Sequence, residues 1–240
     1  MWQIYSSDYD TAGAYYAVKA ACEPVHAQMN LPDFSLAVIN TTRAPRRGLK
    51  LRSRIVSLDN RLLAQRSDNV TVAANSVITL QPLDLARVLT HDDVVLVILS
   101  LEDSKGSRVS DNVYWQGRDD SSLRKLNELA PQPVTISAHE AAGSAEAGST
   151  AESAAAESVV TVDLENRGNA PALAAKLTVV DEQGNRTLPV YYSDNYVTLL
   201  PGAVRHVEIH CPTGGAHCAR IQLRGWNVQP TTATVTAARP

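Results

Sequence analysis

Apolar and polar residues alternate with a period of two through most of the chain after residue 33. Such alternation is typical of β-strands that bury one face. Turn-forming residues such as Pro45 and Lys105-Gly106 separate the alternating segments. The expected strands are 34–40, 49–58, 70–73, 76–80, 94–101, 133–137, 159–165, 173–180, 188–192, 196–199, 204–210 and 218–224. Short strands at this spacing predict β-sandwiches, and the run Val94–Leu99, apolar on both faces, should be a central strand.

A helical period occurs near the N-terminus, where residues 1–28 are expected to form a helical zone. Apolar side chains recur at steps of three and four along one stripe, formed by Tyr15, Val18 and Cys22. Pro24 ends this helix because proline cannot continue the hydrogen-bond ladder. The stripe predicts that Cys22 is a core residue.

Three carboxylates lie near this helix, at Asp8, Asp10 and Glu23. A glycosidase would need two carboxylates a short distance apart, one of them with a raised pKa. No pocket is predicted that would raise one, so Asp10 is interpreted as a helix cap and the others as ordinary surface or ion-paired acids.

The length of 240 residues corresponds to two average domains, and a motif repeats accordingly. Asp103-x-x-Gly106-x-Arg108 is followed by Ser110-Asp111-Asn112, and Asp181-x-x-Gly184-x-Arg186 is followed by Ser193-Asp194-Asn195. An aromatic residue follows each motif, so we expect two copies of one sandwich. The expected division is a helix at 1–28, a first sandwich at 29–124 and a second at 125–240. A low-complexity insertion at 138–158 should separate the first two strands of the second sandwich.

The net charge of −3 excludes a polyanion binder that acts by bulk charge, and the basic residues are unevenly distributed. Residues 41–66 hold eight basic groups against the single acid Asp59. Lys50, Arg52 and Arg54 alternate with smaller or apolar residues, which favours a solvated strand face over a polyanion site. No run of 18 apolar residues exists. Neither nucleic acid nor a membrane is therefore an expected partner.

Neither a phosphate-binding loop nor a Gly-x-Ser-x-Gly elbow occurs, and no cofactor is expected. His210-Cys211 and His217-Cys218 allow three interpretations: a disulfide between Cys211 and Cys218, two free thiols, or a zinc site. The zinc spacing fits no standard finger, so no metal is predicted. Trp115, Trp226 and Tyr196 either stack on sugar rings or fill the sandwich cores.

Several segments resemble glycoside hydrolase family 2, in the branch of the exo-β-D-glucosaminidases and β-mannosidases. Thr11–Gln28, with its Gly-x-Tyr-Tyr and Glu-Pro-x-His-x-Gln elements, resembles the last helix of that family's catalytic barrel and its exit. The matches in the first sandwich are Val38-Ile39-Asn40-Thr41-Thr42 and Ser110-Asp111-Asn112-Val113-Tyr114-Trp115. Those in the second are Leu188-Pro189-Val190, Asp194-Asn195, Leu199–Gly202 and Gly225-Trp226-Asn227.

The resemblance implies a mainly β fold of two tandem immunoglobulin-like β-sandwiches, preceded by one helix that resembles the last helix of a TIM barrel. It also implies the C-terminal, non-catalytic part of a retaining exo-β-glycosidase, which supports the barrel and rims its active site. The family's catalytic carboxylates lie on barrel strands that we do not find here, so no catalytic residue is assigned and the chain alone should be inactive. Its partners would be the upstream barrel and an oligosaccharide or glycoconjugate. The resemblance favours a periplasmic or secreted location, although no signal peptide is recognised at Met1.

Two other hypotheses compete with this one. The chain could be a free-standing carbohydrate-binding or adhesion module that uses Trp115, Trp226 and Tyr196. Alternatively, apolar residues within 1–25 would form an exposed patch in the absence of a barrel, which predicts self-association or a disordered N-terminus.

Overall fold

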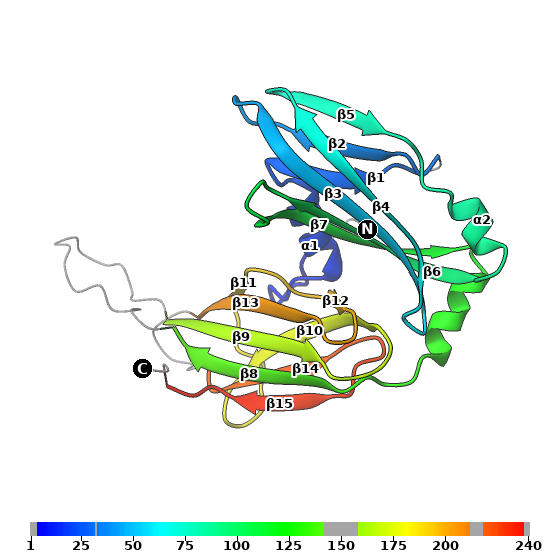
Figure 1. Cartoon of the computed structure of the whole chain (residues 1–240). Coiled ribbons are helices and arrows are strands. Elements are labelled where there is room, and N and C mark those ends of the chain that lie inside the picture. The colour runs from blue at the N-terminus through cyan, green and yellow to red at the C-terminus, as the bar shows by residue number, and fades with distance from the viewer. Residues whose placement is uncertain (1–3, 32, 142–157, 212–217, 238–240) are drawn as a thin grey trace. The chain divides into compact units, whose positions relative to one another are not determined.

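The computed structural model describes residues 4–31, 33–141, 158–211 and 218–237 (Figure 1). It divides into two compact units. The first unit is Ala17–Leu129, and the second unit combines the residues up to Tyr16 with those from Ala130 onward. In the described part of the chain, no helix has the length and apolar character needed to cross a bilayer.

The first unit contains two antiparallel sheets over one apolar core. The strand orders are β1-β2-β5 and β4-β3-β6-β7. The strands are β1 (Val25–Met29), β2 (Leu36–Asn40), β3 (Arg46–Ser57), β4 (Leu62–Val72), β5 (Ser76–Leu80), β6 (Val94–Glu102) and β7 (Arg108–Gly117), and the short helices are α2 (Leu85–Leu89) and η1 (Ser122–Glu128). β6 lies between β3 and β7, which confirms the central strand predicted from its apolar run.

Two strands of the first unit were not predicted. β1 falls in the zone assigned to the helix, yet it pairs with β2 from Val25↔Asn40 to Met29↔Leu36. Its sequence Val25-His26-Ala27-Gln28-Met29 does alternate apolar and polar residues, but the segment is short and directly follows the helical stripe, so it was assigned to the helix zone. β7 includes the polar run Ser110-Asp111-Asn112, which is typical of a turn rather than a strand. In the structure the Asn112 side chain accepts from the next amide, that of Val113, at 3.0 Å, whereas the Ser110 hydroxyl accepts from the distant Ala27 amide at 3.3 Å.

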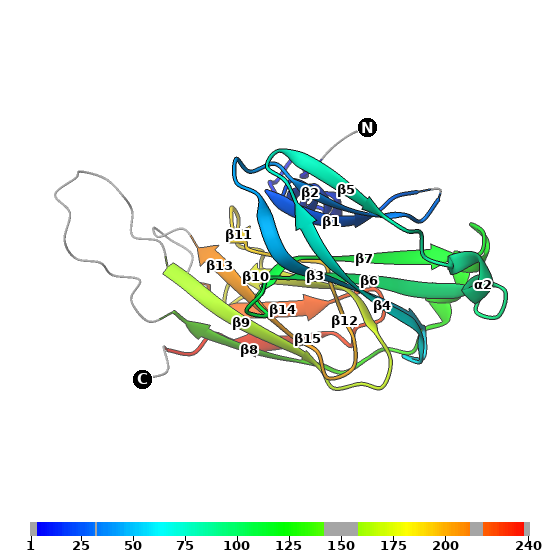
Figure 2. The ribbon, with the colours of Figure 1, turned by 45° about the horizontal axis from the view of Figure 1, so that its top comes forward.

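The second unit also has two antiparallel sheets, with strand orders β12-β10-β14-β15 and β11-β13-β9-β8. Its elements are α1 (Gly13–Ala21), which begins in this unit, β8 (Val134–Glu140), β9 (Ser158–Asn166), β10 (Ala172–Val180), β11 (Tyr191–Tyr192), β12 (Val197–Leu199), β13 (Val204–Cys211), β14 (Arg220–Arg224) and β15 (Thr231–Thr234). Figure 2 shows β13, β9 and β8 in one layer. The fold class is therefore confirmed as mainly β, with two units that are each built of two antiparallel sheets.

β8 and β9 pair with each other across the low-complexity insertion. The insertion therefore connects neighbouring strands of one sheet, but its predicted start at residue 138 is wrong, because β8 continues to Glu140, which pairs with Val160. Residues 142–157 themselves lie outside the described residues.

A buried asparagine closes a loop at the end of β2 in the first unit. Asn40 is fully buried, and its Nδ2 donates to the carbonyl oxygens of Ala44 at 2.9 Å and Ala73 at 2.8 Å. Its Oδ1 accepts from the Thr42 amide at 3.0 Å. One side chain thus satisfies three backbone groups that lie up to 33 residues away.

Asn166, at the end of β9, makes the same bonds in the second unit. Its Nδ2 donates to the carbonyl oxygens of Ala170 and Leu199, both at 2.9 Å, and its Oδ1 accepts from the Gly168 amide at 2.9 Å. The sequence offsets of two, four and 33 residues are the same as those of Asn40. The two sandwiches therefore share a loop-closing device as well as a fold.

The predicted motif repeat is also confirmed in the turns. The Asp103 carboxylate accepts from the amides two and four residues on, at 2.8 Å each, and Asp181 does the same at 2.9 and 2.8 Å. Gly106 and Gly184 have φ values of 82° and 88°, where a side chain would be strained. Each turn closes a strand connection in its own sandwich.

Replacing either loop-closing asparagine should destabilise only the unit that contains it. Asn40→Ala leaves two buried carbonyl oxygens without donors, which is expected to cost about 3 kcal/mol. Hydrogen exchange under increasing urea should show faster opening of β1–β7 for Asn40→Ala and of β8–β15 for Asn166→Ala. The matched control Asn69→Ala, at an exposed position of β4, should stay within about 0.5 kcal/mol of the parent. Equal loss in both units from either single change would contradict this assignment.

Candidate functional site

The segment before α1 folds back on itself as a small hairpin. Tyr5 pairs with Thr11, and the Ala12 amide donates to the Ile4 carbonyl at 3.0 Å. The positive φ of Tyr9, 64°, lets the chain turn tightly between them. This hairpin presents the carboxylates of Asp8 and Asp10 to the second sandwich.

Two cations of the second sandwich bind these carboxylates. Asp10 Oδ2 accepts from Lys176 Nζ and from Arg186 Nη1, both at 2.8 Å, and Arg186 also pairs with Asp8. The Lys176 side chain is only 10% exposed, so Asp10 takes the place of much of the water that would otherwise solvate the ammonium group. The Ser6 hydroxyl, aided by Arg186, holds the pKa of Asp8 below its usual 3.8. We call Asp8, Asp10, Lys176 and Arg186 the N-terminal anchor.

The interpretation of Asp10 as a helix cap is therefore replaced. α1 begins at Gly13, three residues later, and the Asp10 side chain is occupied by Lys176 and Arg186. The carboxylate that the local sequence predicted as a helix cap is thus paired instead with two cations that are distant in the sequence.

Aromatic packing completes the contact between the N-terminal segment and the second sandwich. Tyr16 is 7% exposed within the core of that unit, and its hydroxyl lies 2.9 Å from Thr11 Oγ1. Burial raises the pKa of Tyr16. Its ring centroid lies 6.0 Å from that of Tyr196, over which Lys176 Nζ sits at 5.3 Å. A hydrogen bond of 3.4 Å from Tyr196 Oη to the Thr11 carbonyl adds to this packing.

The predicted stripe of α1 does not form the buried face. Tyr16 is the buried residue, whereas Val18 is 50% exposed and Cys22 is an exposed free thiol. The prediction of Cys22 as a core residue is wrong, because the second unit covers only the start of the helix. The expectation of a disordered N-terminus is wrong for residues 4–16, since the anchor and Tyr16 hold them to the sandwich.

The three aromatic candidates for sugar binding lie in different environments. Tyr196 is half-buried against Tyr16 and Lys176, as described above. Trp226 follows β14, and 53% of its surface is exposed. Trp115 lies on β7 of the first unit, opposite Leu96, and is half-buried. Tyr196 thus joins the N-terminal anchor, and Trp226 has the most accessible ring of the three.

Sequence reasoning overlooked an exposed aromatic pair in the N-terminal hairpin. The rings of Tyr5 and Tyr9 stack with centroids 6.2 Å apart and planes 19° apart, and the two residues are 57% and 68% exposed. The spacing of four residues gave no signal, because it becomes a contact only when the hairpin turns at Tyr9.

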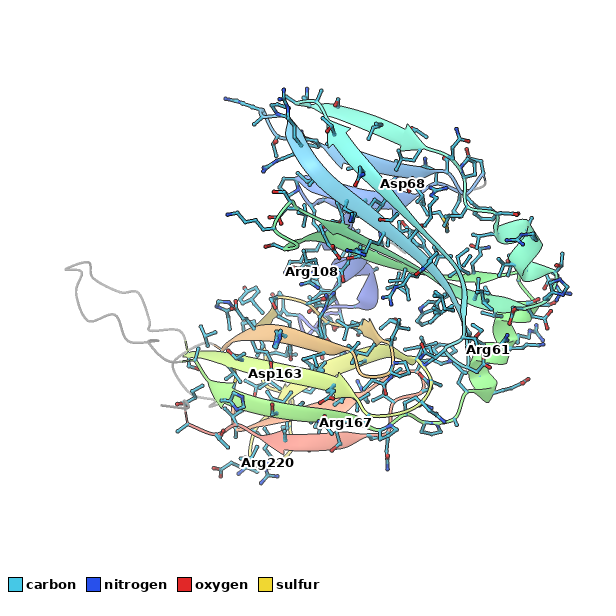
Figure 3. The ribbon with its side chains drawn as sticks, in the orientation of Figure 1. Arg61, Asp68, Arg108, Asp163, Arg167 and Arg220 are labelled. Atoms are coloured by element: carbon cyan, nitrogen blue, oxygen red, sulfur yellow. A yellow bond between two sulfur atoms is a disulfide. The ribbon has the colours of Figure 1, made fainter. Side chains whose placement is uncertain are left out.

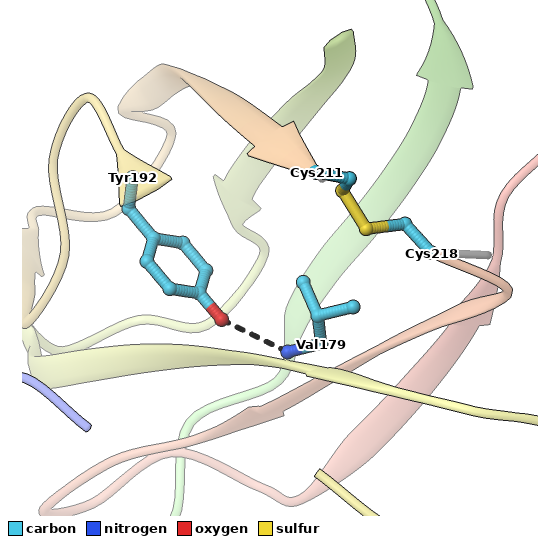
Figure 4. Close-up of a disulfide and its surroundings, with 4 residues drawn as sticks. All are labelled: Val179, Tyr192, Cys211 and Cys218. Atoms are coloured by element: carbon cyan, nitrogen blue, oxygen red, sulfur yellow. Dashed lines mark hydrogen bonds between the residues drawn. A yellow bond between two sulfur atoms is a disulfide. The ribbon is translucent and has the colours of Figure 1, made fainter. Parts of the chain in front are cut away.

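Cys211, at the end of β13, forms a disulfide with Cys218 (Figure 4), with Cα atoms 6.3 Å apart. Nearby, the Tyr192 hydroxyl accepts from the Val179 amide at 3.0 Å, and burial raises the pKa of Tyr192. Among the described residues no group of three or more potential metal ligands comes together. His217, part of the zinc interpretation, lies outside those residues.

Two family models match consecutive parts of the chain. The mannosidase Ig/CBM-like domain matches residues 33–117, and the exo-β-D-glucosaminidase Ig-fold domain matches residues 112–228. The pair thus defines tandem immunoglobulin-like domains of the kind found in glycosidases.

The chain is similar to larger enzymes over nearly its whole length. It is 31% identical to an exo-β-D-glucosaminidase of Streptomyces avermitilis, over 94% of this chain and 26% of that protein. It is 25% identical to a mannosylglycoprotein endo-β-mannosidase of Lilium longiflorum, over 94% and 29%. The crystal structure of the Amycolatopsis orientalis exo-chitosanase CsxA superposes with a TM-score of 0.82 at 27% identity, covering 97% of this chain and 29% of CsxA.

The two domains are accordingly Ig-fold domains of the exo-β-D-glucosaminidase and mannosidase kind, from glycoside hydrolase family 2, and they match the C-terminal region of CsxA. The chain spans between a quarter and a third of the length of these relatives. The resemblance inferred from the sequence motifs is confirmed.

Neutralising Asp10 should release the N-terminal segment. Asp10→Asn leaves the buried Lys176 without its carboxylate, which is expected to destabilise the second unit by about 2 kcal/mol or more. Hydrogen exchange should show faster exchange over residues 4–16. The matched control Asp163→Asn removes a carboxylate that pairs with an exposed histidine of the same unit, and should change stability by less than about 0.5 kcal/mol. Unchanged protection of residues 4–16 in Asp10→Asn would contradict the role of the anchor.

Proposed function

We propose that this chain is the C-terminal accessory, non-catalytic part of a retaining exo-β-glycosidase of the β-mannosidase or exo-β-glucosaminidase type. In the intact enzyme it would hold the last helix of the catalytic barrel and support the barrel from its C-terminal side. The observation that carries this proposal is the N-terminal anchor, which binds the segment leading into that helix to the second sandwich.

The exposed side of the N-terminal segment supports the same role. Ile4, Tyr5, Tyr9 and Val18 are between 39% and 68% exposed, although residues of this type are usually buried. One side of the segment is thus fixed to the sandwich and the other is apolar and accessible. That arrangement suits an element that lies between a sandwich and a barrel. The stacked Tyr5 and Tyr9 would then be placed to rim the active site, where loops before barrel helices gather.

The carboxyl groups of the described residues also support a non-catalytic role. Burial raises the pKa of Asp111, as a catalytic acid would require. Its carboxylate nevertheless lies 3.3 Å from the Arg108 guanidinium, which is the arrangement of a structural ion pair. We therefore assign no catalytic residue to this chain, and its partners would be the barrel and the barrel's oligosaccharide or glycoconjugate substrate.

The purified chain should not hydrolyse aryl β-glucosaminides or aryl β-mannosides. Double displacement needs two carboxyl groups about 5 Å apart, and in this family these lie on barrel strands. Release of the chromogenic phenol would be measured, with the Amycolatopsis orientalis exo-chitosanase as positive control. Turnover by the 240-residue chain that survives further purification would overturn the proposal.

A free-standing carbohydrate-binding or adhesion module is a second candidate, favoured by the exposure of Trp226. If the chain has this function, Trp226→Ala should weaken binding of neutral mannan or glucosamine oligomers about tenfold in calorimetry. Tyr191→Ala, which removes another exposed ring of the second unit, is the matched control. Absence of binding by the unaltered chain would reject this candidate and leave the accessory role untouched.

A further inference from the structure

Three cations stand in a row on one face of β3. Lys50, Arg52 and Arg54 alternate with the buried Leu51 and Ser53, so their side chains lie on the face opposite the core. This confirms the alternation predicted from the sequence. A solvated strand face would by itself account for the alternation, so a binding site requires further observations.

The first such observation is that two of the three cations are not neutralised. Arg52 Nε donates to Glu102 Oε2 at 3.1 Å across the sheet. Lys50 and Arg54, on either side, make no ion pair with any described residue. Other exposed arginines of the first unit, such as Arg61 and Arg87, are paired with aspartates. The uncompensated positive charge extends along β3, whose first residues Arg46 and Arg47 are exposed and also form no ion pair with a described residue.

The second observation is that the surface is hollowed here. A hollow of about 550 Å³ is lined by Arg52, Arg54 and Glu102 among others, and one of about 470 Å³ by Lys50, Arg52 and Glu102. Because they share Arg52 and Glu102, the two hollows adjoin and form one groove across β4, β3 and β6. Each volume falls in the range of ordinary ligand sites. We call this surface the basic groove.

The rest of the lining indicates the kind of ligand. β4 contributes Gln65, Ser67 and Asn69, which stand opposite Arg54, Arg52 and Lys50 respectively. Their amides and hydroxyls can donate to and accept from sugar hydroxyls. No aromatic residue lines either hollow, so the groove has no platform on which nucleic-acid bases could stack.

We propose that the basic groove binds an acidic oligosaccharide, with sugar carboxylates on Arg54 and Lys50 and sugar hydroxyls on the polar residues of β4. Arginine binds a carboxylate through two parallel hydrogen bonds, which gives such a contact direction as well as charge. The groove would act as a secondary binding site that holds the chain to a uronate-containing polymer. It is independent of the proposed accessory role, because it lies within the first unit and needs neither the barrel nor the N-terminal anchor.

The test is calorimetric titration of the whole chain with oligogalacturonate, a polymer of carboxylate sugars. Binding is expected at about 20 mM salt and should weaken at least about tenfold at about 200 mM salt, because the contacts are exposed charges. Neutral mannan oligomers and cationic glucosamine oligomers should bind at least about tenfold more weakly.

Two double variants separate the groove from bulk charge. Lys50→Gln with Arg54→Gln should weaken oligogalacturonate binding by about tenfold or more. Arg220→Gln with Arg224→Gln removes two positive charges at the same four-residue spacing from exposed positions of β14 in the second unit, and should stay within about twofold. Figure 3 labels Arg220. Both variants change accessible side chains, so circular dichroism and melting temperature should match the parent.

Several outcomes would overturn the proposal. One is absence of oligogalacturonate binding at low salt, and another is equal loss in the two double variants, which would indicate bulk charge alone. A third is binding of neutral mannan as tight as that of oligogalacturonate. A fourth is tighter binding of single-stranded DNA, which would show that the ligand is a nucleic acid. None of these results bears on whether the chain lacks glycosidase activity.

Discussion

The buried ammonium group of Lys176 sets the condition on which the second sandwich depends. It lies on β10, inside a sheet, with 10% of its side chain exposed. Moving such a charge out of water costs several kcal/mol unless a carboxylate meets it at close range. Asp10 supplies that carboxylate from 166 residues away. The charge of Lys176 is therefore compensated only when the N-terminal segment is bound to the second sandwich.

The residues of the N-terminal anchor compensate the charge of Lys176 and hold the N-terminal segment only in combination. Arg186 belongs to the motif that repeats in both sandwiches, but the equivalent Arg108 binds Asp111, a residue of its own turn region. The second copy has turned the same arginine toward Asp8 and Asp10. The two sandwiches thus share this motif, but only in the second sandwich does its arginine bind the segment that leads into α1.

The features predictable from the sequence were those set by local periodicity and by turn chemistry. The apolar run of β6, the alternating cations of β3 and the paired aspartate turns all follow from residues close together in the chain. β1 was not predicted because its five alternating residues directly follow the helical stripe, and a run this short does not outweigh the longer helical pattern. Between Cys211 and Cys218 the sequence left a disulfide, free thiols and zinc open, because spacing alone cannot tell which groups approach each other.

The candidate site was largely beyond sequence reasoning for a similar reason. Nothing near Asp10 indicates that its partners are Lys176 and Arg186, so helix capping was the natural interpretation. Tyr196 was singled out as a candidate for stacking on sugars, and its packing against Tyr16, which comes from the opposite end of the chain, was not predicted. The loop-closing bonds of Asn40 and Asn166 likewise join residues 33 positions apart, which no local pattern reports.

The discontinuity of the second unit has a consequence for the order in which the protein is made. Asp10 leaves the ribosome 166 residues before Lys176 does. At about 5–20 residues per second this is a delay of roughly 8 to 33 s. The whole first unit, which ends at Leu129, is synthesised during that interval. The first sandwich can therefore fold as soon as it emerges, whereas the N-terminal hairpin cannot bind the second sandwich until Lys176 and Arg186 have been synthesised.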